Sequence, residues 1–116
     1  IPDEVDLIKA KTLSYVEKNV DLVVFTGGTG LSKRDVTPEA LEGIIQRKIP
    51  GMEEAIRAYG QQRTPYSMLS RSVAGTINQT LVLALPGSTN GAKESMDAIF
   101  PAVLHVFGII KGARHN

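Results

Sequence analysis

Apolar positions alternate along the chain between helical spacing and short continuous runs, which predicts alternating helices and strands. Helical spacing over Glu4–Lys18 predicts a first helix. An apolar run rich in β-branched residues at Leu22–Thr26 predicts a strand buried on both faces. Helical spacing returns at Pro38–Arg47 and again at Met52–Tyr59, and Gly60 is expected to end the last of these helices.

The second half of the chain predicts a strand hairpin followed by one long helix. Residues 61–69 have no clear period, which predicts a loop with a short helical turn. Arg71–Ile77 and Thr80–Leu85 predict two antiparallel strands, and the second is apolar enough to be central in a sheet. Helical spacing over Gly91–Lys111 predicts a closing helix, which Pro101 is expected to kink.

This order of elements predicts an α/β fold with three layers, α/β/α, and a mostly parallel sheet that contains an antiparallel hairpin. The 116 residues suit one domain, 1–116, with a substantial core. Only three strands are predicted, which is few for a strand buried on both faces. Because the chain also begins with Ile1 rather than methionine, we expect an N-terminally incomplete domain that lacks its first strand or strands.

Composition excludes several functional classes. The net charge is +1 and aromatic residues make up 5% of the chain, so neither a basic stripe nor a stacking platform for nucleic acid is present. The absence of cysteine excludes disulfides, thiolate nucleophiles and sulfur-ligated metals. No apolar run approaches the roughly 20 residues of a membrane span. We therefore expect a soluble, cytoplasmic protein.

A glycine-rich loop follows the strand at Leu22–Thr26 directly. Three of the four residues in Gly27–Gly30 are glycines, whose freedom to adopt positive φ lets main-chain N–H groups converge on an anion. The loop lacks the Gly-Lys-Ser/Thr of a P-loop, and Lys33 stands where a dinucleotide-binding fingerprint needs its third glycine. An anion site and a tight structural turn are both open, and Lys33 and Arg34 favour a phosphate.

Two aspartates are candidate ligands of a metal ion. Asp35 can cap a turn, which composition alone favours, or hold Mg²⁺ beside bound phosphates. Asp3 presents the same choice, since it can simply be the N-cap of the first helix. His105 and His115 have no matching cluster of ligands, so neither is expected to bind a metal.

Two further loops lie beside predicted strands. Ser70 and Arg71 come just before a strand, where an arginine is usually a surface residue but can also donate a forked pair of hydrogen bonds to a phosphate. Pro86–Ser88 follows the second apolar strand, so it is either a plain turn or shares a rim with the first glycine loop.

These stretches together resemble the MoaB/Mog family of molybdenum-cofactor biosynthesis proteins, which includes molybdopterin adenylyltransferases. The residues that carry the resemblance occur in the family's order over nearly the whole chain: Ile1–Glu4, Thr26–Gly30, Arg34–Pro38, Pro50 and Gly51 with Glu54 and Arg57, Leu69–Arg71, and Leu85–Gly87 with Lys93 and Glu94. The combination of TGGTG with RDVTP is specific. Family members begin with a further strand and a site loop, so the resemblance also implies an N-terminally incomplete domain.

The resemblance implies an adenylyl transfer. In this reaction the terminal phosphate of molybdopterin attacks the α-phosphorus of Mg-ATP, which gives adenylyl-molybdopterin and pyrophosphate. The family's two functional carboxylates match Asp3 and Asp35, which would be the catalytic residues and the ligands of Mg²⁺. The alternatives are a molybdopterin-binding or scaffold module without catalysis and, more distantly, a generic nucleotide-binding domain.

The resemblance also implies binding residues and partners. Residues expected to bind molybdopterin or phosphate are Thr26, Gly27, Gly28, Thr29, Gly30, Arg34, Thr37, Ser70 and Arg71. Residues expected to bind the nucleotide are Pro86, Gly87, Ser88 and Gly91. The expected partners are molybdopterin and ATP, other copies of the chain in a homotrimer or homohexamer, and fused or contacting cofactor-biosynthesis proteins, with no nucleic acid and no membrane.

Overall fold

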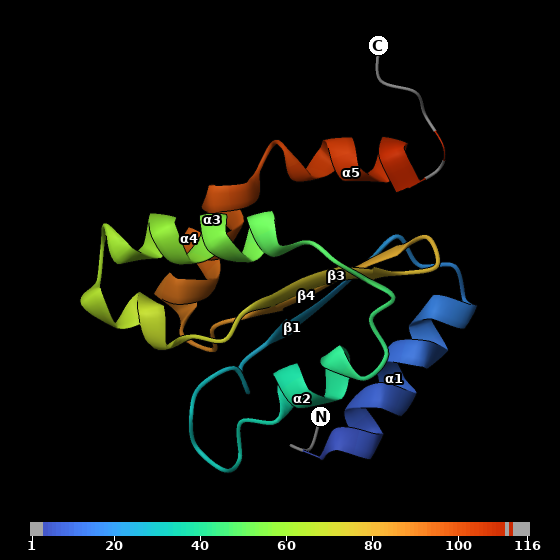
Figure 1. Ribbon diagram of the computed structural model, residues 1–116, viewed down its shortest axis with the longest axis horizontal. Coiled ribbons are helices and arrows are strands. Elements are labelled where there is room, and N and C mark those ends of the chain that lie inside the picture. The colour runs from blue at the N-terminus through green and yellow to red at the C-terminus, as the bar shows by residue number, and fades with distance from the viewer. Residues whose placement is uncertain (1–3, 111, 113–116) are drawn as a thin grey trace.

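The computed structural model describes residues 4–110 and 112 and shows an α/β fold (Figure 1). Its elements, in chain order, are α1 (Val5–Glu17), β1 (Leu22–Thr26), α2 (Thr37–Glu42), β2 (Arg47–Lys48), α3 (Pro50–Gln61), the 3₁₀ helix η1 (Pro65–Leu69), β3 (Val73–Ile77), β4 (Thr80–Leu85), α4 (Thr89–Ile99) and α5 (Val103–Ile110).

The four strands form a mixed sheet in the order β1-β4-β3-β2. The β3–β4 pair is the predicted antiparallel hairpin, and β4 occupies the predicted central position. Only β1 and β4 are parallel, with Leu22 opposite Leu81, while the other two pairings are antiparallel. The prediction of a mostly parallel sheet is therefore wrong for the strands described. The two-residue strand β2 was not predicted, because so short a segment has no periodicity.

Every residue of β4 is buried, and its alternate side chains point to opposite faces of the sheet. Val82 and Ala84 belong to a core cluster with residues of α1 and α2. Leu81, Leu83 and Leu85 belong to a second cluster with residues of α3, α4 and α5. Figure 1 shows these two groups of helices on opposite sides of the sheet, which confirms the three-layer prediction.

Strand β1 has the predicted bounds but not the predicted burial. Val23 is 6% exposed and packs toward α1 and α2, whereas Val24 is 40% exposed on the other face. On that second face α4 packs against β4 and α3 against β3. Since β1 is at the edge of the sheet among the described strands, its outer residues lack the cover that an apolar run alone suggested.

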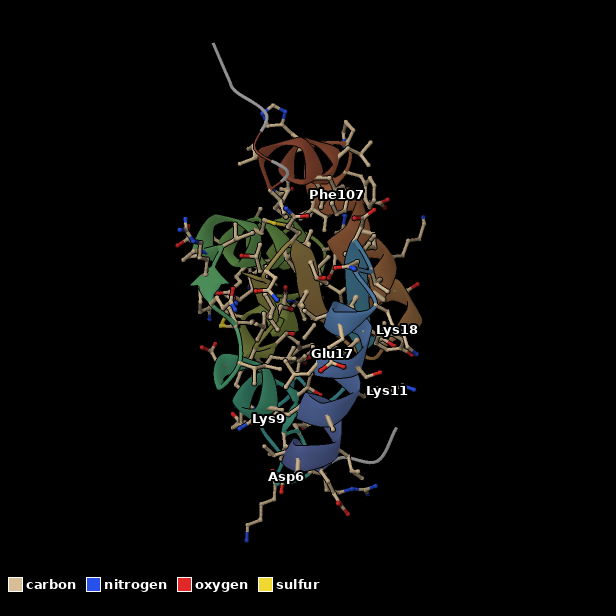
Figure 2. All side chains as sticks on the ribbon, turned by 90° about the vertical axis from the view of Figure 1, so that its right-hand side faces the viewer. Asp6, Lys9, Lys11, Glu17, Lys18 and Phe107 are labelled. Carbon is tan, nitrogen blue, oxygen red and sulfur yellow. The ribbon has the colours of Figure 1, made fainter. Side chains whose placement is uncertain are left out.

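The first helix forms one residue inside each of its predicted ends. Ile8 and Val16 are buried against the sheet. Figure 2, in which α1 faces the viewer, shows charged side chains pointing away from the sheet, among them Asp6, Lys11 and Lys18. The helix therefore covers the core with its apolar side and presents charge outward.

The second predicted helix is too long. Helix α2 ends at Glu42, and the chain then turns to pair Arg47 with Thr76 of β3. Main-chain bonds from Gln46 N to Thr76 O, 2.9 Å, and from Ile49 N to Ala74 O, 2.9 Å, extend this pairing. The segment after Glu42 therefore forms hydrogen bonds with the open edge of β3 and does not continue the helix that its apolar spacing predicted.

The third helix is longer than predicted. Gly60 lies inside α3 instead of ending it, and is buried. A Cβ atom on Gly60 would lie 2.3 Å from Ser67 Oγ of η1, so this glycine allows close packing between the helix and the turn. The short helical turn predicted within residues 61–69 is η1.

The predicted closing helix is two helices. Helix α4 ends at Ile99, and α5 begins at Val103. Phe100 is extended, with ψ of 145°, as expected for the residue before a proline. Pro101 therefore ends the first helix where a kink was expected, because a proline removes a helical hydrogen bond and its ring clashes with the preceding turn. Within the described part of the chain, no helix is both long and apolar enough to cross a membrane.

Candidate functional site

The two glycine-bearing loops meet at one edge of the sheet. Strands β1 and β4 are parallel neighbours, so the loops that follow Thr26 and Leu85 leave the sheet side by side. Gly27 N donates to Leu85 O at 2.9 Å. A Cβ atom on Gly87 would lie 3.1 Å from Gly27 Cα, which shows how closely the two main chains approach. The predicted shared rim is confirmed.

The first loop needs glycine at specific positions. Gly27 and Gly28 have the predicted positive φ, at 94° and 69°, whereas Gly30 does not have a positive φ. A Cβ atom on Gly28 would lie 2.2 Å from Thr37 Oγ1, and one on Gly30 would lie 2.7 Å from Asp35 Oδ2. The loop is therefore folded tightly onto the start of α2 and onto the carboxylate of Asp35.

The carbonyl groups of this loop are held by other parts of the chain. Gly28 O accepts from Thr37 N at 3.1 Å, and Thr29 O accepts from Arg71 N at 2.8 Å. By contrast, no group within residues 4–110 and 112 accepts a hydrogen bond from the main-chain N–H of Gly28 or Thr29. Successive main-chain N–H groups that are free in a glycine turn can form an anion-binding nest.

A hollow of about 430 Å³ joins this loop to Asp35 and to the second loop. We call it the loop hollow, and its lining residues are Gly27, Gly28, Thr29, Gly30, Asp35, Tyr66, Leu69, Ser70, Pro86 and Gly87. Eight of these ten residues were predicted from the sequence as site residues, and Tyr66 and Leu69 were not. Asp3, the other predicted carboxylate, lies outside the described residues.

Asp35 combines a capping position with a place in the loop hollow. Its Oδ2 atom accepts from Ser32 N at 3.0 Å, which is the predicted turn-capping contact. The Ser32 hydroxyl and then the Ser32 main-chain N–H lower the pKa of Asp35, and the positive charge of Arg71 adds to this effect. The wall of the loop hollow therefore carries an ionised carboxylate at neutral pH.

Arg71 holds the loop from behind and does not line the loop hollow. Its Nε atom donates to Gly30 O at 2.8 Å, its Nη2 atom donates to Asp35 O at 2.6 Å, and its Nη1 atom pairs with Glu39. These contacts occupy the forked face that a phosphate would need. The structure thus gives Arg71 the role of fixing the loop, and its predicted phosphate contact remains a prediction.

Three other predicted residues also lie outside the loop hollow. Thr26 and Arg34 are exposed, at the end of β1 and in the turn before Asp35 respectively. Thr37 is buried as the first residue of α2, with its side chain behind Gly28. Although threonine is a common N-cap residue, Thr37 does not cap this helix, because the N-cap residue is Val36 and no side chain makes a capping bond.

A second hollow of about 240 Å³ adjoins the first and shares Tyr66, Ser70 and Pro86 with it. We call it the hydroxyl hollow, because most of the side chains that line it carry a hydroxyl group. Its lining residues are Ile56, Arg57, Gly60, Thr64, Tyr66, Ser67, Ser70, Ser72, Pro86, Ser88, Gly91, Glu94 and Ser95. The predicted nucleotide-binding residues Ser88 and Gly91 lie here. Ser88 Oγ accepts from Gly91 N at 3.0 Å and caps α4.

Ser70 stands in the wall between the two hollows. Its Oγ atom lies 3.3 Å from Thr29 Oγ1 and 3.2 Å from Ser72 Oγ, so three hydroxyls form a continuous chain. Thr29 and Ser72 are each 3% exposed. This chain connects the glycine loop to the start of β3 and fixes the hydroxyl of Ser70 at the junction.

Sequence reasoning did not assign several lining residues of the hydroxyl hollow as site residues, among them Arg57, Tyr66, Ser72 and Glu94. They come from α3, η1, the start of β3 and α4, so no single spacing in the sequence groups them. The only sequence signal was that Arg57 and Glu94 stand among the residues that carry the family resemblance.

The donor set fits a magnesium ion that is held mainly by phosphate oxygens. Residues 4–110 and 112 contain no group of three or more aspartate, glutamate, histidine or cysteine side chains placed to hold a metal. Mg²⁺ commonly takes one or two carboxylates together with phosphate oxygens and water. Asp35, ionised and lining the same hollow as Gly28 and Thr29, whose N–H groups have no acceptor in the described part of the chain, satisfies that requirement.

Comparisons with known proteins show which family this chain belongs to. The family described as "Probable molybdopterin binding domain" matches residues 1–105. A molybdopterin adenylyltransferase from Helicobacter pylori strain 26695 is 39% identical over 113 residues, which are 97% of this chain and 64% of that protein. A molybdenum cofactor biosynthesis bifunctional protein from Chlorobaculum tepidum is 39% identical over 114 residues, which are 98% of this chain and 36% of that protein.

The fold of this chain is also similar to that of solved structures. The crystal structure of the molybdopterin biosynthesis enzyme MoaB from Thermus thermophilus has a TM-score of 0.89 to this chain at 40% identity, and the match covers 99% of this chain and 73% of that one. The chain spans less than two thirds of the length of both sequence relatives named above. The family match over residues 1–105 and the agreement in fold confirm the resemblance: this chain belongs to the MoaB/Mog family of molybdenum-cofactor biosynthesis proteins.

Proposed function

We propose that this domain transfers the adenylyl group of ATP to the terminal phosphate of molybdopterin. The observation that carries the proposal is the loop hollow, where free N–H groups of Gly28 and Thr29 and the ionised carboxylate of Asp35 meet. A relative at 39% identity bears the name molybdopterin adenylyltransferase, which supports this reaction over other phosphate chemistry.

In the proposed reaction an oxygen of the molybdopterin phosphate bonds to the α-phosphorus of ATP. The bond from the α-phosphorus to the oxygen that bridges it to the β-phosphorus breaks, and pyrophosphate leaves with that electron pair. Such a reaction requires positioning and neutralisation of phosphate charge more than acid–base chemistry. The N–H groups of Gly28 and Thr29 would bind phosphate oxygens, and Ser70, at the junction of the hollows, would orient them.

Asp35 would hold Mg²⁺ together with phosphate oxygens of the substrates, with Asp3 as the proposed second carboxylate. A bound magnesium ion would neutralise negative charge on the reacting phosphates. The hydrogen bonds that lower the pKa of Asp35 suit this role, because they keep the carboxylate ionised at acidic as well as neutral pH.

The proposal is tested with the full-length protein, molybdopterin and Mg-ATP, by measuring release of pyrophosphate. We expect stoichiometric pyrophosphate and adenylyl-molybdopterin from the wild type and neither from a folded Asp35→Asn variant. The proposal would be wrong if the folded wild-type protein bound both substrates and released no pyrophosphate.

A second candidate is a domain that binds molybdopterin without catalysis. The description of the matching family, which names binding alone, favours it. Calorimetry separates the two candidates: an adenylyltransferase binds both molybdopterin and Mg-ATP, whereas a binding module takes up molybdopterin and gives no heat with the nucleotide.

A further inference from the structure

Two of the cations near the hydroxyl hollow are already neutralised by carboxylates. Lys48 Nζ lies 2.5 Å from Glu42 Oε1 and 3.1 Å from Glu53 Oε2. Burial alone would lower the pKa of Lys48, but the bonds to these two glutamates outweigh it and raise that pKa. Arg71 pairs with Glu39. Neither cation is therefore available to a ligand without losing an existing partner.

Arg57 differs from both. It lies on α3, is half-buried, and lines the hydroxyl hollow as well as a neighbouring hollow that contains Lys48 and Arg71. Its main-chain oxygen accepts from Ser67 Oγ at 3.2 Å. Across the described part of the chain its guanidinium has neither an ion pair nor a hydrogen bond. A partly desolvated guanidinium without a partner gains most from an anion, because its N–H groups match phosphate geometry.

An uncompensated carboxylate lines the same hollow. Glu94 is on α4, is half-buried, and forms no ion pair with Arg57 or with any other residue that the structure describes. The hydroxyl hollow thus holds one positive and one negative side chain that do not neutralise each other. An ionised carboxylate only accepts hydrogen bonds, so its complement is a group with N–H donors.

We propose that Arg57 binds a phosphate of the ligand in the hydroxyl hollow, while Glu94 accepts hydrogen bonds from N–H groups of the ligand's heterocycle. The ligand class is a phosphorylated heterocycle with an exocyclic amino group. This inference rests on the proposed function, whose two substrates, a nucleotide and a phosphorylated pterin, both belong to this class. It makes Arg57, and not Arg71, the arginine that contacts phosphate.

The hollow's position supports this assignment. The hydroxyl hollow adjoins the loop hollow along Tyr66, Ser70 and Pro86, so a ligand whose heterocycle lies beside Glu94 can direct its phosphate end toward the loop hollow. The surrounding hydroxyls can donate or accept, and therefore suit the sugar or ring oxygens of either substrate.

The test compares phosphorylated ligands with their phosphate-free counterparts on the full-length protein. The two pairs of probes are AMP with adenosine and molybdopterin with a pterin that lacks phosphate. A hydrogen bond to a charged group contributes about 1.5–3 kcal/mol, so Arg57→Gln should weaken the phosphorylated member of one pair by about 10- to 150-fold and leave its counterpart unchanged. The pair that responds identifies the occupant.

Three further variants keep the test decisive. Arg47→Gln removes the same charge from an exposed position that lines neither hollow, and should bind like the wild type. Arg57→Lys should recover part of the affinity, because it restores the charge without the fork. Glu94→Gln should weaken both members of the responding pair by the same factor, since both carry the heterocycle.

Equal affinities in Arg57→Gln and Arg47→Gln for all four probes would overturn the inference, as would equal weakening of both members of a pair by Arg57→Gln. These results are independent of turnover. If the wild type releases pyrophosphate and Arg57→Gln binds normally, the inference fails and the proposed function stands. If Arg57→Gln loses phosphate-dependent binding and the wild type releases no pyrophosphate, the inference stands and the proposed reaction fails.

Discussion

The guanidinium of Arg71 donates a hydrogen bond to the main-chain oxygen of Asp35, with 2.6 Å between Nη2 and O. The same side chain donates from Nε to Gly30 O at 2.8 Å. One arginine at the start of the β3 region therefore holds both ends of the segment from Gly30 to Asp35. The place of the Asp35 carboxylate in the loop hollow depends on a residue that lies outside that hollow.

Replacing Arg71 with lysine should separate positioning from charge. Arg71→Lys keeps the positive charge but cannot donate to Gly30 O and Asp35 O together, so the loop should loosen. We expect turnover to fall by at least tenfold, with the largest amide chemical-shift changes between Gly30 and Asp35. Arg63→Lys, on an exposed arginine stacked on Tyr59, is the matched control. Wild-type turnover in Arg71→Lys would show that the clamp has no part in catalysis.

Asp35→Asn and Asp35→Ala should distinguish the two roles of this residue. Asparagine keeps an oxygen that can accept from Ser32 N, while alanine removes it. We expect both variants to abolish pyrophosphate release and to change the free energy of unfolding by less than about 1 kcal/mol, as exposed substitutions usually do. Chemical denaturation provides the measurement. A collapse of stability in Asp35→Ala, with Asp35→Asn as stable as the wild type, would instead make Asp35 a structural cap.

The hydrogen bonds of Asp35 also predict a pH dependence. Its folded-state pKa is lowered, chiefly by the Ser32 hydroxyl, so it lies below the unfolded value of about 3.9. The stability that this carboxylate contributes is therefore present above about pH 3.9 and is lost as pH falls through the folded-state pKa.

Carboxyl carbon NMR titration can measure this effect directly. We expect the Asp35 resonance to titrate below the ordinary aspartate range in the wild type, and to move back toward that range in Ser32→Ala, where the hydroxyl is absent. In Asp35→Asn, the difference in unfolding free energy from the wild type should shrink as the pH falls below about 3.9. An unshifted Asp35 in the wild type would contradict the prediction.

Local sequence signals predicted the elements and much of the loop hollow. The apolar run Leu22–Thr26 has the bounds of β1, and Thr80–Leu85 those of β4. Since two such strands lie parallel and adjacent, their following loops meet, and that placed Gly27–Gly30 beside Pro86 and Gly87 in one hollow. These features depend on residues close together in the sequence and on one general rule of α/β sheets.

The features that sequence reasoning missed depend on partners far along the chain. The strand at Arg47–Lys48 exists because the edge of β3 accepts it. Arg57 and Arg71 look alike as isolated arginines, yet within the described residues one guanidinium has no partner and the other holds three. Whether a guanidinium is free or engaged is set by carbonyls and carboxylates brought in by the fold, and no local pattern encodes it.

The tight contact between the glycine loop and α2 predicts opposite effects for two glycines. Gly28 has φ of 69°, and an added Cβ atom would lie 2.2 Å from Thr37 Oγ1. Gly51 is in the first turn of α3, and an added Cβ atom there meets nothing within 4 Å. Gly28→Ala should therefore reduce the free energy of unfolding by about 1–3 kcal/mol from backbone strain alone. Gly51→Ala should leave it unchanged or raise it by about 0.4–1 kcal/mol.

A double variant separates the two causes at Gly28. Thr37→Ala removes the hydroxyl that an alanine at position 28 would meet, but it leaves the positive φ of 69° in place. Adding Thr37→Ala to Gly28→Ala should therefore recover the steric part of the loss and none of the backbone part. Chemical denaturation of the four proteins in this cycle measures both parts, because residues in contact are expected to be non-additive. Additive losses would show that the loop moves away from α2 freely, and Gly28 would then not be needed to hold the N–H groups in place for an anion.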